Sequence, residues 1–120
     1  ENIALWLRQN EKLIVPEWIK LVRSRGGDRD RQLTTRELER QFFMDFYHAF
    51  VQGVASDDDG PLADVMERIA VTRVSQEFHL EETLNIFFLL KELIWERLQQ
   101  VYPPETVLSR MGILDPAFDR

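Results

Sequence analysis

The spacing of apolar residues constrains the fold of this 120-residue chain more than any other feature. Between a few glycine and proline boundaries, apolar side chains recur every three to four residues, which is the period of an α-helix. No stretch alternates polar and apolar residues over the length of a strand, and no unit repeats along the chain. The sequence therefore predicts an all-α helical bundle with four main helices and a short C-terminal helix.

The first two predicted helices have clear start and stop signals. The first covers residues 3–23, and we expect a kink or a break near Ile14 because Pro16 lacks a backbone donor and crowds the preceding turn. The second covers residues 34–55, where the run Thr34 to Glu37 has the pattern of a capping box.

The remaining helices are bounded by proline and polar residues. A third helix should begin at Pro61 and end near Gln76 or Glu77. A fourth should begin at His79 and end before Pro103, and a short helix over residues 105–111 follows. The residues we expect in the core are Trp18, Phe42, Phe46, Phe50, Ile69, Leu84, Phe87, Phe88 and Leu98.

Composition excludes several classes of function. The formal net charge of −6 disfavours binding to nucleic acid and to anionic membrane surfaces. No apolar stretch is long enough to span a bilayer, so we expect no membrane insertion. There is no cysteine, which excludes disulfides and agrees with a cytoplasmic protein. Because the sequence starts at Glu1 and stops at Arg120 in polar sequence, we expect residues 1–120 to be one domain of a longer protein.

None of the candidate metal-binding residues has the sequence spacing that its site would need. The acidic run at residues 57–60 lacks the EF-hand pattern, since Leu62 and Arg68 occupy the positions that need glycine and glutamate, and a solvated turn is expected. His48 and His79 have no metal-binding spacing around them. The sequence therefore predicts no catalytic, cofactor-binding or metal-binding residues.

Aromatic side chains are abundant, with eight Phe, three Trp and two Tyr. Core packing accounts for most of them, and the remainder can line a ligand cavity or a dimer interface. The helix over residues 80–101 is apolar on nearly all sides, and a 120-residue chain has few helices to cover it. We therefore expect a homodimer. The candidate interface residues are Leu5, Trp6, Ile86, Leu89, Leu90 and Leu93.

Two segments resemble a known family. These are the run Arg73 to Leu84, followed by Leu89-Leu90-Lys91-Glu92-Leu93-Ile94, and the opening Trp6-Leu7-Arg8-Gln9-Asn10 with Trp18. They are similar to the N-terminal domains of RsbR-type and RsbRD-type co-antagonists of the bacterial stress-response pathway, a domain type that also precedes histidine kinase cores. Glu77 and His79 depart from the pattern, which often has Gly and Ser there.

The resemblance implies a helical, sometimes globin-like bundle without haem, commonly dimeric, with no enzymatic activity and with a downstream output domain in the same chain. We accordingly expect a non-catalytic sensory or regulatory input domain of a bacterial signalling protein. Two alternatives stay open. One is a globin-like haem or ligand sensor with His48 as the axial ligand, and the other is a plain protein-interaction adaptor.

Overall fold

The structure, a computed structural model, describes residues 2–25, 43–75 and 79–112. Within these ranges the chain forms only helices, so the predicted all-α class is confirmed. The helices are α1 (Ile3–Gln9), α2 (Glu11–Arg25), α5 (Met44–Ser56), α6 (Gly60–Ser75), α7 (Leu80–Gln99) and α8 (Pro104–Gly112).

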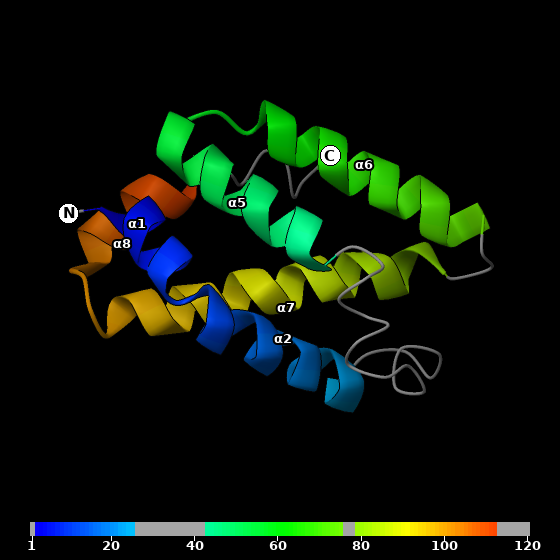
Figure 1. The fold of residues 1–120 in the computed structure, drawn as a ribbon, viewed down its shortest axis with the longest axis horizontal. Helices are drawn as coiled ribbons and strands as arrows, with labels where there is room; N and C mark the ends of the chain where they lie inside the picture. The colour runs from blue at the N-terminus through cyan, green and yellow to red at the C-terminus, as the bar shows by residue number, and fades with distance from the viewer. Residues whose placement is uncertain (1, 26–42, 76–78, 113–120) are drawn as a thin grey trace.

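Helix α7 is the central element of the bundle. It runs between α2 on one side and α6 on the other, and it contacts both of them as well as α8 (Figure 1). Helix α5 packs against α6 and α1, and α8 packs against α7 (Figure 1). The start of α6, the start of α7 and both ends of α8 lie within one residue of those that the sequence predicts, whereas α7 ends at Gln99, a few residues before Pro103. The predicted end of the third helix, at Gln76 or Glu77, lies outside the described residues.

Aromatic rings from three helices form the centre of the core. Trp18 of α2 stacks on Phe43 with ring centroids 4.3 Å apart, and Phe46 of α5 stacks on Phe87 of α7 at 4.5 Å. The Trp18 indole also donates a buried hydrogen bond of 2.9 Å to the carbonyl of Ile86. Stacked rings contribute beyond the area that they bury, so this cluster joins α2, α5 and α7 into one unit.

The predicted core is largely confirmed. Six of its residues are buried, namely Trp18, Phe46, Phe50, Ile69, Phe87 and Leu98. Leu84 is only half-buried, and the prediction for Phe88 is wrong because its side chain is 39% exposed. Phe42 and the predicted capping box at residues 34–37 lie outside the described residues.

The first predicted helix is broken at Asn10 rather than near Ile14. The carbonyl of Trp6 accepts hydrogen bonds from both the backbone N–H and the side-chain amide of Asn10, which ends α1. Helix α2 then begins at Glu11, so Pro16 stands only in its second turn and removes a single bond to the first turn. The prediction of a break near Ile14 was wrong, because α2 is continuous through Ile14 and the chain breaks at Asn10, where the asparagine side chain caps α1.

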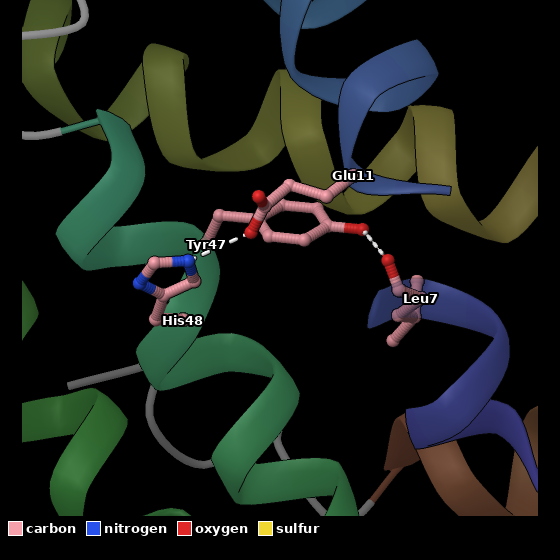
Figure 2. Close-up of polar contacts among 4 residues, drawn as sticks. All are labelled: Leu7, Glu11, Tyr47 and His48. Atoms are coloured by element: carbon pink, nitrogen blue, oxygen red, sulfur yellow. Dashed lines mark hydrogen bonds and ion pairs between the residues drawn. The ribbon is translucent and has the colours of Figure 1, made fainter. Parts of the chain in front are cut away.

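Two side chains of α5 make polar contacts with the residues on either side of the break between α1 and α2. The Tyr47 hydroxyl donates a 2.5 Å hydrogen bond to the carbonyl of Leu7, one of the last α1 carbonyls that lack a helical partner (Figure 2). The next residue, His48, contacts the carboxylate of Glu11 at 2.7 Å (Figure 2). Two adjacent α5 residues thus bind the end of α1 and the start of α2. Burial, together with the nearby Glu11 carboxylate, raises the pKa of Tyr47 well above its usual range, so the phenol stays protonated.

Candidate functional site: the outer face of α7

Helix α7 carries large apolar side chains on two opposite faces. The inner face is buried in the core and consists of Thr83, Ile86, Phe87, Leu89, Leu90, Leu93, Ile94 and Leu98. The outer face is exposed or half-buried and consists of Leu80, Leu84, Phe88, Lys91, Glu92, Trp95, Glu96 and Gln99. Successive helical positions are about 100° apart. Phe87 is accordingly 1% exposed whereas its neighbour Phe88 is 39% exposed.

The structure changes the basis of the predicted dimer interface. Ile86, Leu89, Leu90 and Leu93 belong to the inner face and are buried within a single chain, so a partner cannot reach them in this conformation. Leu5 is exposed on α1, and Trp6 is half-buried against the core. The sequence shows that α7 is apolar all round, but it does not show which side the other helices cover.

A shallow groove of about 490 Å³ lies along the C-terminal half of the outer face. Phe88 and Trp95 are seven residues apart and therefore lie nearly in line along the helix. Lys91 lies on one side of this line, and Glu92 and Glu96 lie on the other. The outer face thus presents an aromatic ridge with a cation on one flank and carboxylates on the other.

A second groove, of about 300 Å³, follows the seam between α6 and the N-terminal half of α7. Its floor includes Met66 and Phe87, and Leu80 and Leu84 belong to its α7 side. Asp64 and Glu67 give its α6 side a negative charge. Apolar surface therefore continues along the outer face from Leu80 to Trp95.

The corner between α6 and α7 contains a buried polar contact. Arg73, 2% exposed, donates through Nε to the hydroxyl of Thr83 at 3.0 Å. Both residues belong to the segment that carries the family resemblance. A buried guanidinium needs hydrogen-bond acceptors, so this contact fixes the end of α6 against the start of α7.

The other candidate sites have structural roles. His48 is exposed and bonded to Glu11, and it lines neither of the two grooves described above. His79 precedes α7 as its N-cap in extended conformation. Asp57 ends α5 with a left-handed backbone, and Asp58 accepts from the N–H of Gly60, as expected for a turn.

The described part of the chain contains neither a metal-binding cluster nor a membrane-spanning helix. Within residues 2–25, 43–75 and 79–112, no group of three or more histidine or carboxylate side chains is placed to hold a metal ion. None of the six described helices has the length and apolarity needed to cross a bilayer.

Comparison with protein families decides the class of the domain. Residues 13–119 match the family described as the RsbT co-antagonist protein rsbRD N-terminal domain. The chain belongs to this family. It is therefore a regulatory input domain of the stressosome type, and the resemblance seen in the sequence is confirmed. No curated protein and no solved structure matches the chain.

The match places the features above inside or outside the rsbRD N-terminal domain. The Arg73–Thr83 contact and the whole outer face of α7 lie inside the matched residues. Helix α1 and the break at Asn10 lie before them. Among the described residues of the matched region, the outer face of α7 combines exposed and half-buried apolar side chains with two grooves, and it is the candidate functional site.

Proposed function

We propose that this domain is a dimeric input module that uses the outer face of α7 to pair with a second copy. Changes in that pairing would act on an output domain further along the same chain, either a stressosome-type regulator or a histidine kinase core. The proposal includes a cytoplasmic location, which the cysteine-free composition permits.

The aromatic ridge, in which Phe88 is exposed and Trp95 is half-buried, is the observation that supports this function. Phe88 and Trp95 stand on the central helix of the bundle, where they offer apolar area to a partner. Aromatic side chains are enriched in the cores of protein interfaces, and contiguous apolar patches are uncommon on monomers. A pairing surface at this position explains why α7 has large apolar residues on both faces.

Helix α7 is also well placed to pass on a change. Its inner face belongs to the aromatic core, and its C-terminal end packs against α8, the last described helix. A small shift of a packed helix at a subunit interface is a common form of switching. A shift of α7 against its partner would therefore move α8 and whatever follows it.

Sedimentation equilibrium at micromolar concentration tests the pairing. The wild-type domain should sediment as a dimer of the 14.3 kDa chain, and Trp95→Ser should shift it towards monomer. Leu13→Ser is the matched control, because Leu13 is a large exposed apolar residue on α2 and away from α7. A wild-type monomer, or equal loss of dimer in both variants, would contradict the proposal.

Hydrogen exchange in the full-length protein tests the coupling. Trp95→Ser should change the protection of amides in the output domain, whereas Leu13→Ser should leave it as in the wild type. If Trp95→Ser dissociated the dimer but left the amide protection of the output domain unchanged, the domain would pair without regulating its output.

A further inference from the structure

We infer that the two copies pair with their α7 helices parallel, so that Phe88 and Trp95 of one copy face the same residues of the other. This orientation rests on the proposed function, since it specifies the partner contact at the same surface. It is decided by the charges beside the aromatic ridge.

The ridge defines the line of contact. Phe88 and Trp95 are separated by seven residues, the repeat that keeps side chains on one side of a paired helix. Lys91 lies about 50° to one side of their common line and Glu92 about 50° to the other, with Glu96 further round on the Glu92 side. The outer face therefore has a cationic flank and an anionic flank.

Which flanks meet across the two-fold axis differs between a parallel and an antiparallel pair. In a parallel pair the two-fold axis runs along the helices. The cationic flank of one copy therefore meets the anionic flank of the other. Lys91 then faces Glu92 and Glu96 of the second copy, and the contact occurs twice by symmetry. The lysine ammonium has three donors, so it can accept these partners in addition to contacts within its own chain.

An antiparallel pair brings like charges together. Its two-fold axis lies across the helices, so each flank meets the same flank of the partner. Centred between Phe88 and Trp95, this arrangement would place Lys91 against Lys91 and Glu92 against Glu92. Like charges at close range disfavour it, and the arrangement of charges on the outer face therefore selects the parallel pair.

The orientation has a direct consequence for the output. In a parallel pair the two α8 helices lie at the same end of the dimer, because each packs against the C-terminal end of its own α7. In an antiparallel pair they would lie at opposite ends of helices that are about 30 Å long. Two output domains that follow α8 can act on each other only in the first case.

Charge exchange tests the orientation. Lys91→Glu should weaken the dimer about tenfold, because both copies of the contact change from attractive to repulsive. The double variant Lys91→Glu/Glu92→Lys should restore most of the affinity, since the opposite charges face each other again and the net charge is that of the wild type. Lys12→Glu, an exposed change on α2 with the same charge difference as Lys91→Glu, should leave the dimer as in the wild type.

Spin labels give an independent distance. The chain has no cysteine, so Glu81→Cys introduces a single labelling site near the start of α7. Parallel helices should hold the two attachment points about 10 Å apart, whereas the antiparallel pair separates them by about 30 Å. The long distance, or a Lys91→Glu dimer as tight as the wild type, would overturn the parallel arrangement.

The outcomes separate this inference from the proposed function. A dimer that Trp95→Ser dissociates but Lys91→Glu does not would keep the α7 interface and refute its orientation. A wild-type chain that stays monomeric would refute both.

Discussion

Phe87 and Phe88 are neighbours in the chain with opposite surroundings. Phe87 stacks on Phe46 in the core, whereas Phe88 belongs to the exposed ridge of the outer face. They have the same side chain, the same helix and almost the same local sequence. The difference between them comes entirely from which side of α7 the helices α2, α5 and α6 cover. Burial in this bundle is therefore decided by the neighbours of a residue and not by its own hydrophobicity.

The two phenylalanines provide the largest expected contrast. Phe87→Ala should lower the free energy of unfolding by about 3–5 kcal/mol, because it leaves a cavity beside Phe46. Phe88→Ala should lower it by less in the monomer, since the Phe88 side chain is 39% exposed and loses less packing than Phe87. Urea unfolding at a concentration where the protein is monomeric measures both. Equal losses would mean that the two faces of α7 are not distinct.

The inner face of α7 also includes one polar side chain, Thr83, which can be compared with an exposed threonine. Thr83→Val keeps the shape of the side chain but removes the acceptor for Arg73 Nε, so we expect a loss of about 1.5–3 kcal/mol from a buried charged donor. Thr72→Val is the matched control, because Thr72 is exposed and its hydroxyl bonds only to the carbonyl of Arg68. Its loss in the same urea titration should stay within about 0.5 kcal/mol.

Helix α5 repeats the contrast at Tyr47 and His48. Tyr47→Phe removes the donor to the Leu7 carbonyl, which should cost about 1–2 kcal/mol at neutral pH. The raised pKa of Tyr47 adds a pH dependence. A phenol with a higher pKa in the folded protein contributes stability that is complete below its unfolded pKa, near 10, and is lost as the pH rises above it. Wild-type unfolding free energy should therefore fall more steeply above pH 10 than that of Tyr47→Phe.

His48, the exposed neighbour of Tyr47 in α5, should have the smallest effect on the unfolding free energy. His48→Ala removes the contact with Glu11, and an exposed pair of this kind contributes at most about 1 kcal/mol. The measurement is the same denaturation curve, in buffer of low and of high salt. If His48→Ala lowered the unfolding free energy more than Tyr47→Phe does, the exposed contact with Glu11 would stabilise the α1–α2 break more than the buried hydrogen bond does.

The sequence predicts the helices well because their signals are local. Pro61 and His79 mark helix starts that the structure reproduces within one residue, and the Pro103-Pro104 pair lies between the end of α7 and the first turn of α8. The aromatic core was also predictable in most of its members, since Phe46 and Phe50 repeat at helical spacing. The break at Asn10 was missed, although an asparagine between two apolar helical stretches is a recognisable capping signal.

The candidate site was not predictable to the same degree because it depends on tertiary packing. The sequence indicates that α7 has more apolar surface than one side of a helix needs, which is what led to the expectation of an interface. It contains no local signal that Leu89 and Leu93 are buried while Phe88 is exposed and Trp95 is only half-buried. The same limit applies to Tyr47, whose acceptor on Leu7 lies forty positions earlier in the chain.

The docking of α1 bears on how this domain can be moved between proteins. The family match begins at Leu13, yet Ile3 and Leu7 are buried against the bundle and Tyr47 reaches back to α1 for its hydrogen bond. The segment that similarity recognises is thus shorter than the segment that packs into the core. A chimera that joins this domain to a foreign output should keep the first twelve residues, since a graft starting at Leu13 would expose the core residues that α1 covers and leave the Tyr47 hydroxyl without its acceptor.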